Sequence, residues 1–335
     1  KSRILATMSN SSLFLLLSLL MQYSSVIEAT FTIAAADINT SQVGGAGSTC
    51  IEMDGFSILE AVYVSVPGKA VLHAQAFVGQ NTPVKLLAKE MMSNGTLPVD
   101  ILEAITSPKV DMAVIQINAD TFLPGHSMRQ YGLVDVSGNV AGYTGANIES
   151  TYEMFGFPPS AQTDEQGKVD NYVFSAQGNV VSEGTVPMLV STFQQVKNSN
   201  ETCNDLAQRL MDSVAAVHSA GLGDVRCENG VGSIAFLHVD AADGENIVSI
   251  DIPYKESIKD PIEALKLAFE EWRESNPCDN KNNTGATSGV FSPSITGDNK
   301  NNTGATSGVF FSFNYWPSFS CVYNIYIFLS FPIYL

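Results

Sequence analysis

Basic residues are scarce in this sequence, which has 17 Lys and Arg against 34 Asp and Glu and a formal net charge of −17. A protein that binds nucleic acid needs clustered Lys and Arg to neutralise phosphates. The sequence has no such cluster, so we expect no nucleic-acid partner. The acidity itself is typical of a soluble surface and leaves the substrate unspecified.

Histidine is rare as well, and His73, His126, His218 and His238 do not have the spacing of metal ligands. The sequence also lacks a phosphate-binding Walker loop and a nucleophile elbow. We therefore expect neither a cofactor nor a metal ion. The one glycine cluster, at residues 44–47, favours a closely packed strand over a phosphate cradle.

The N-terminal region has the features of an export signal. The apolar run at 13–21 is too short to span a bilayer but has the length of a signal-peptide core. The small Ala29 stands where a signal peptidase cuts. We expect residues 1–29 to be a signal peptide, Thr30 to begin the mature protein, and the protein to be secreted or held on the cell surface.

An N-terminal threonine carries its own catalytic pair. Its hydroxyl is a nucleophile, and its α-amine, with a pKa of about 8, is a base that takes the hydroxyl proton. The alternative is that Thr30 is an ordinary strand residue, because threonine favours strands.

Export exposes cysteines to oxidising conditions, so we expect one or two disulfides. The body contains Cys50, Cys203, Cys227 and Cys278, and Cys321 lies in the tail. Four cysteines allow three pairings, of which we favour Cys203 with Cys227 because they flank one predicted helix. Secretion also predicts a glycoprotein, with N-x-Ser/Thr sequons beginning at Asn39, Asn94, Asn200, Asn282 and Asn301.

Residues 30–278 are expected to form one domain in which short β-like runs alternate with helical stretches. Strands are predicted at 30–36, 42–50, 70–77, 130–136, 140–144, 172–177, 233–239 and 247–252. Helices are predicted at 83–92, from residue 98, and at 184–195, 205–220 and 261–272. Strands in blocks and helices in pairs favour a layered α+β sandwich over a strict βαβ alternation.

The C-terminal region differs in composition. Residues 279–291 recur unchanged at 298–310, and we expect 279–308 to be a polar, solvated linker. Residues 309–335 carry no charge and many aromatics. Three interpretations stay open for this tail: a GPI-attachment signal that gives membrane attachment, a membrane span disfavoured by Pro317 and Pro332, and translated non-coding sequence.

Six short motifs occur in an order typical of one family. They are TFTIA from Thr30, MRQYGLVD from Met128, TGA from Thr144, AQGN from Ala176, GDVR from Gly223, and DIPY from Asp251 followed by Asp260-Pro261. In these motifs the chain resembles the DUF1028 proteins, a mostly bacterial family of unknown function with an Ntn-hydrolase-like fold. The resemblance implies a four-layer αββα sandwich with the site at the N-terminus of the first strand. Members begin Met-Thr-Phe, so loss of Met bares the threonine that matches Thr30.

The resemblance also implies a chemistry, because Ntn hydrolases cleave amides through an acyl-enzyme ester. It implies that Thr30 attacks a small-molecule or peptide amide and that Gln177 and Asn179 support the oxyanion. Gln177-Gly178-Asn179 is alternatively a turn that ends a strand. A non-catalytic binding module on the same fold is the alternative function.

Four further residues are weaker candidates for the site. Asp224 and Arg226 either orient the site or form an ion pair with each other. Gln75 and Arg129 either belong to the site or only satisfy buried backbone groups.

The sequence departs from the family pattern in two places. Thr49-Cys50 stands where relatives usually have Ser followed by a basic residue, which removes a cation that helps to lower the pKa of the amine. After Arg226, residues 227–233 replace the Gly-x-Gln-Ser run of relatives.

Overall fold

The computed structural model describes residues 30–77, 83–118, 120–154, 156–157, 160–196, 205–227 and 232–277. Among these residues, every helix is too short or too polar to cross a membrane. Two predicted glycosylation sites, Asn39 and Asn94, are exposed. The predicted signal peptide, linker and tail lie outside the described residues, as do Cys203, Cys278, Cys321, Asn200, Asn282 and Asn301.

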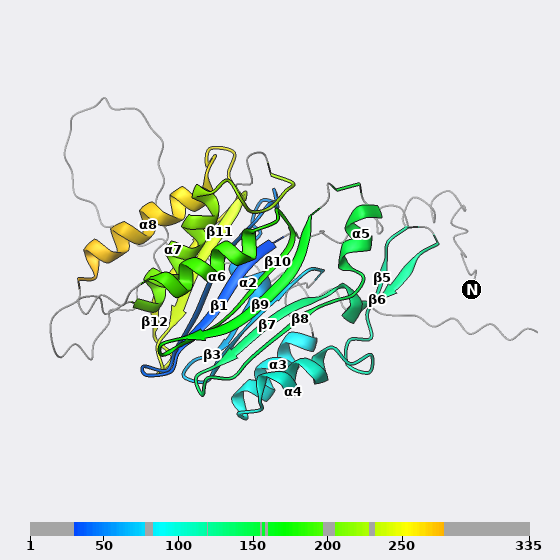
Figure 1. Cartoon of the computed structure of the whole chain (residues 1–335), viewed down its shortest axis with the longest axis horizontal. Coiled ribbons are helices and arrows are strands. Elements are labelled where there is room, and N and C mark those ends of the chain that lie inside the picture. Colours follow the sequence, from blue (N-terminus) through cyan, green and yellow to red (C-terminus); the bar gives the residue numbers. More distant parts are fainter. Residues whose placement is uncertain are drawn as a thin grey trace, which may run out of the picture. The chain divides into compact units, whose positions relative to one another are not determined.

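The fold is a mixed α/β arrangement of antiparallel sheets with helices packed on them (Figure 1). The first sheet contains, in spatial order, β12 (Asn246–Ile252), β11 (Ile234–Asp240), β2 (Gln42–Thr49), β1 (Thr30–Asp37), β10 (Tyr172–Val181) and β9 (Ala161–Val169). The second contains β3 (Tyr63–Val66), β4 (Ala70–Gln75), β7 (Gln130–Asp135) and β8 (Val140–Thr144). A separate hairpin pairs β5 (Val114–Gln116) with β6 (Phe122–Pro124).

Helices cover the outer face of each sheet, as Figure 1 shows. The core of the six-stranded sheet is shared with α6 (Thr185–Gln195), α7 (Asp205–Ser219) and α8 (Pro261–Ser275). The core of the four-stranded sheet is shared with α3 (Pro83–Ser93) and α4 (Pro98–Ile105). Among the described residues, the remaining helices are α2 (Ile58–Val62), α5 (Ile148–Met154) and a short 3-10 helix, η1 (Gly125–Met128).

Strand β1 lies inside the six-stranded sheet, and its alternating side chains face two different layers. Phe31 and Ile33 pack into the core shared with the helices. Ala34 and Ala36 pack on Val71 and Val134 of the other sheet. The side chains of β1 with even residue numbers, including that of its first residue, therefore lie between the two sheets.

The glycines of β2 allow the two sheets to approach closely. A Cβ at Gly45 would lie 2.1 Å from Nε2 of His73, a residue of β4. His73 is fully buried, and both of its ring nitrogens lack a hydrogen-bond partner. Burial lowers the pKa of His73 to about 3, so the ring is neutral at physiological pH. The glycine cluster is confirmed as a packed strand.

Each predicted strand and helix is present, with ends shifted by a few residues. The predicted strand 172–177 is longer than expected, because β10 continues to Val181. Gln177 and Asn179 therefore lie inside a strand, and the interpretation of this tripeptide as a strand-ending turn is wrong. No predicted element corresponds to β3, β5, β6, β9, α2, α5 or η1. Strand β9 (AQTDEQGKV) was missed because it is polar on both faces, as suits its position at the sheet edge.

Candidate active site

Thr30 is the first residue of β1 and lies between two polar neighbours. It pairs with Thr49 on β2 and with Asn179 on β10. Its side chain is on the face toward the other sheet, and the residue is only 1% exposed. Thr30 Oγ1 donates a hydrogen bond to Thr49 Oγ1 over 3.3 Å. In the full chain its nitrogen is bonded to Ala29, so the amine exists only after cleavage there.

A network of buried amides joins the two sheets beside Thr30. Gln75 Nε2 donates to the carbonyl oxygen of Thr30 over 3.3 Å, and Gln75 Oε1 accepts from Thr32 Oγ1 over 3.0 Å. Gln130 Oε1 accepts from Gln75 Nε2 and from Asn179 Nδ2. Buried polar groups are costly unless they are paired, so these bonds fix the separation of the sheets at this end.

Asn179 and Gln177 both face the space between the sheets, but at different distances along β10. Asn179 stands directly opposite Thr30, and its Oδ1 accepts from the Tyr152 hydroxyl over 3.2 Å. Gln177 stands opposite Thr32, and its Nε2 donates to Ser175 Oγ. The Oε1 atom of Gln177 is buried without a hydrogen-bond partner. Of these two residues, only Asn179 is therefore a direct cross-strand neighbour of Thr30.

Backbone strain is concentrated next to this network. Val180, which follows Asn179, has φ 54°, and Ala76 and Phe77, which follow Gln75, have φ 60° and 57°. Left-handed backbone at residues other than glycine costs on the order of 1–3 kcal/mol each and gathers at functional sites. The packing and hydrogen bonds around these residues must therefore hold the strained backbone in place at this end of the sheets.

Asp224 and Arg226 form an ion pair, as one of the two interpretations predicts. Arg226 Nη2 and Nε donate to the two oxygens of Asp224 over 2.7 and 3.1 Å. Asp224 is fully buried and accepts a further bond from the backbone N–H of Cys50 over 2.9 Å. A β-bridge joins Asp224 to Val181. The pair therefore connects the end of β2 to the end of β10, on either side of β1.

A disulfide joins Cys50 to Cys227, with a Cα–Cα separation of 5.6 Å. The predicted pairing of Cys203 with Cys227 is therefore wrong. The bonds that Asp224 makes instead bring Cys227 to the end of β2.

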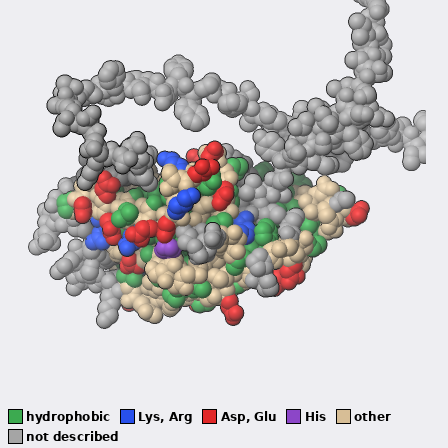
Figure 2. All heavy atoms as spheres, turned by 90° about the horizontal axis from the view of Figure 1, so that it is seen from above, with side chains coloured by type: hydrophobic (Ala, Val, Ile, Leu, Met, Phe, Trp, Pro, Cys, Tyr) green, Lys and Arg blue, Asp and Glu red, His purple; other side chains and the backbone are tan. Residues whose placement is uncertain are grey.

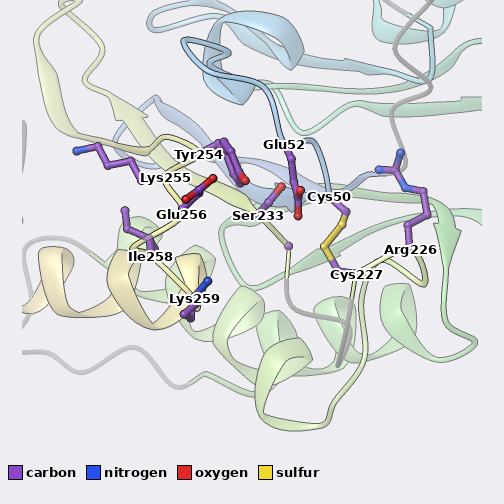
Figure 3. Close-up of a pocket in the computed structure, with 11 residues that line it drawn as sticks. Cys50, Glu52, Arg226, Cys227, Ser233, Tyr254, Lys255, Glu256, Ile258 and Lys259 are labelled. Atoms are coloured by element: carbon purple, nitrogen blue, oxygen red, sulfur yellow. A yellow bond between two sulfur atoms is a disulfide. The ribbon is translucent and has the colours of Figure 1, made fainter.

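A cavity of about 380 Å³ opens beside the disulfide. Figure 3 shows Cys50, Cys227 and Arg226 on one side of it and Tyr254 with Glu256 on the other. Glu52, Lys255 and Lys259 also line it, so the cavity presents both signs of charge. Basic and acidic side chains are similarly mixed on the face shown in Figure 2. Because Ser233 donates its backbone N–H to Thr49 O, this cavity borders the strand that pairs with Thr30.

The sequence matches the family of unknown function DUF1028 over residues 30–265. The chain belongs to the DUF1028 family. It is similar to the crystal structure of a DUF1028 protein from Silicibacter pomeroyi, with 21% identity, a TM-score of 0.49, and coverage of 73% of this chain and 89% of that chain. No curated protein matches this sequence. The family resemblance is confirmed, and its description assigns no activity.

Of the two weaker candidates in this DUF1028 chain, Gln75 lies beside Thr30, whereas Arg129 forms an ion pair with Asp111. Gln75 is in the amide network, where it binds the backbone oxygen of Thr30. Arg129 instead pairs with Asp111, with Nε 3.0 Å from Oδ2. Gln130 was not among the predicted site residues, although it follows Arg129 in a family motif. Thr49 and Tyr152 were not predicted either, because nothing in the sequence distinguishes them from threonines and tyrosines outside the site.

Among the described residues of this DUF1028 chain, no group of three or more His, Cys, Asp or Glu side chains is arranged to hold a metal ion. The side chains around Thr30 are hydroxyls and amides, which orient and polarise a reacting group without binding a metal tightly.

Proposed function

We propose that this DUF1028 protein is a secreted amidohydrolase whose nucleophile is the N-terminal threonine left by cleavage after Ala29. One observation carries the proposal: Thr30 is the first residue of a central strand, and its buried hydroxyl donates to Thr49 Oγ1 beside the amide network. Cleavage there creates an amine on the same residue as the hydroxyl. It also removes residues 1–29, which precede the buried end of β1 in the sequence.

We also propose a fold assignment. The two facing sheets, with helices on their outer faces, would form the four-layer αββα sandwich of Ntn hydrolases. The position of Thr30 at the start of a central strand, facing the space between the sheets, supports this assignment.

The mechanism begins with a proton transfer within Thr30. The α-amine accepts the hydroxyl proton while Oγ1 bonds to the carbonyl carbon of the amide. The C–N bond then breaks, and the leaving amine takes that proton. Water hydrolyses the resulting ester, which releases a carboxylic acid and restores Thr30. Thr49 Oγ1, 3.3 Å from Thr30 Oγ1, orients the attacking hydroxyl.

Asn179 is the best placed group to stabilise the oxyanion. It lies directly across from Thr30, and its bonds to Tyr152 and Gln130 fix its amide before the substrate arrives. Gln177 lies opposite Thr32, so in this mechanism it supports the strand next to Asn179 rather than contacting the first tetrahedral intermediate.

Arg226 brings a cation to the end of β2, where the family pattern places a basic residue. Its guanidinium reaches the end of β2 through Asp224, which also holds the Cys50 N–H. Because the Asp224 carboxylate neutralises this charge, we expect no strong lowering of the amine pKa from the ordinary α-amino value of about 8. Acylation should then speed up between pH 6 and pH 9.

The cavity next to the disulfide is the proposed substrate pocket. Its volume of about 380 Å³ is in the range of small-ligand sites. Tyr254 offers an aromatic face, and acidic and basic side chains lie on the same wall. This lining suits a short polar amide, either a small molecule or a peptide end.

The test compares two forms of the protein, one starting at Thr30 and one starting at Ala29. Both have the Thr30 hydroxyl, but only the first has the amine on the same residue. We expect a fluorescent β-lactone to acylate Thr30 in the first form and to react at least about 100-fold more slowly with the second. Thr30→Ala should abolish the label without changing the melting temperature.

Equal labelling of the two forms would contradict the proposed base. An absence of labelling from pH 6 to pH 9 in the form starting at Thr30 would support the non-catalytic binding module instead.

A further inference from the structure

A second polar cluster lies at the sheet edge formed by β12. His238 of β11 is directly across from Ser249 of β12. His238 Nδ1 is 2.9 Å from Ser249 Oγ, and its Nε2 is 2.9 Å from Asp240 Oδ1. A hydroxyl, an imidazole and a carboxylate thus form one hydrogen-bonded series. None of the three belongs to the Thr30 network.

The carboxylate decides the direction of these hydrogen bonds. Asp240 Oδ2 also accepts from the Tyr63 hydroxyl over 2.9 Å and from Ser65 Oγ over 2.7 Å. Burial alone raises the pKa of Asp240, but these bonds and His238 together bring it below its ordinary value. An ionised carboxylate only accepts hydrogen bonds, so His238 Nε2 carries a proton. In the neutral form of the ring, Nδ1 then presents its lone pair to the Ser249 hydroxyl.

This cluster is open to small molecules. Ser249 is partly exposed on an edge strand, and the His238 side chain is 11% exposed. A cavity of about 340 Å³, a volume typical of small-ligand sites, lies against His238. Its walls also include Tyr63 and Ser65 of β3, Glu60 of α2, and Lys85 and Lys89 of α3.

The cluster is separate from the site at Thr30. On β2, Gly45 pairs with His238 and Thr49 pairs with Thr30. Four residues of a strand span about 13 Å, so the two hydroxyls belong to different positions along the sheet. A function of this cluster therefore does not depend on the cleavage after Ala29.

We propose that Ser249, His238 and Asp240 form a second nucleophilic site, which hydrolyses small carboxylic esters. Ser249 Oγ bonds to the ester carbonyl carbon as its proton moves to His238 Nδ1. The ester C–O bond breaks, and the leaving alkoxide takes that proton. Water then cleaves the acyl-serine by the same proton path, which releases the carboxylic acid. Asp240 acts as a positioning residue that holds the Nε2–H tautomer.

The experiment treats the full chain with a fluorescent fluorophosphonate and identifies the modified residue by peptide mass spectrometry. We expect the phosphonate on Ser249, no label in Ser249→Ala, and labelling about 100-fold slower in His238→Gln. Ser219→Ala is the matched control, because the exposed Ser219 hydroxyl donates to Ala215 O within α7, and this variant should label at the wild-type rate. Ser57 is an internal comparison, because its hydroxyl donates to the Asp251 carboxylate rather than facing an imidazole, and it should stay unmodified.

Two further measurements separate a nucleophilic site from a structural network. Asp240→Asn should slow labelling, because an amide can hold the other His238 tautomer, and Asp240→Glu should restore part of the rate. Hydrolysis of p-nitrophenyl acetate should be lost in Ser249→Ala.

The proposal would be overturned if native Ser249 reacted no faster than Ser57, a comparison that needs no variant to fold. It would also be overturned if folded His238→Gln labelled at the wild-type rate, or if Ser249 were phosphonylated but the ester were not turned over.

Discussion

Loss of the Cys50–Cys227 disulfide should strongly destabilise the protein. The bond closes a loop with a sequence separation of 177 residues and fastens the turn of Asp224 to the end of β2. For a loop of this length, the chain-entropy model gives about 5 kcal/mol, and measured losses for native disulfides are about 2–5 kcal/mol. Domains are stable by only about 5–15 kcal/mol, so this single bond is a large share of the total.

The perturbation is Cys50→Ser, Cys227→Ser, and the double variant, each unfolded in urea at 25 °C. Either single change breaks the bond, so all three should lose the same free energy. With an m-value of about 2.5 kcal/mol/M, the midpoint should fall by about 1–2 M. Reduced wild-type protein should match the variants.

Peptide mapping without reduction gives the direct control. It should recover a peptide that contains Cys50 bonded to one that contains Cys227. A bond from Cys227 to Cys203, or a loss of stability below about 1 kcal/mol in the double variant, would refute the reasoning.

Three further predictions concern the sheets and the tail. His73 has a pKa of about 3 in the fold and about 6.5 when unfolded, so the unfolded state alone gains a proton as the pH falls below 6.5. Acidification from pH 7 to pH 5 should therefore lower the free energy of unfolding by about 2 kcal/mol through His73. Urea unfolding of His73→Leu should lack this loss, and a variant with the wild-type pH dependence would contradict the reasoning. A Cβ at Gly132 would lie 1.9 Å from Gln177 Nε2, so Gly132→Ala should cost about 1–3 kcal/mol and lower the melting temperature by several degrees. A wild-type melting temperature would show that Gln177 moves aside freely. Truncation after Cys278 should leave the melting temperature unchanged, because the polar repeat and uncharged tail offer no periodic face to pack on the domain; a large fall would show that the tail packs.

Local patterns predicted most of the elements around the site. A short β-like run predicted β1, and the glycines of residues 44–47 correctly indicated a strand packed closely against its neighbours. These features depend on contacts near in sequence or on the steric properties of one residue. The polar edge strand β9 could not be found in this way, because solvent on one side removes the need for an apolar pattern.

The surroundings of Thr30 were harder to predict because they come from distant parts of the chain. Gln75, Gln130 and Asn179 meet only when the two sheets face each other. The same is true of Cys50 and Cys227, whose pairing depends on the bond from Cys50 N–H to Asp224. A sequence shows that such residues are polar or oxidisable, but not which of them meet.

The position of the mature N-terminus tests the central claim most directly. The full sequence should be expressed in a secretory host, and the first residue of the exported protein identified by N-terminal sequencing and intact mass. We expect Thr30, because only that start places an amine on the residue whose hydroxyl lies at the buried end of β1. A mature protein that begins at Ala29, at Phe31, or at any other residue would contradict the proposed mechanism.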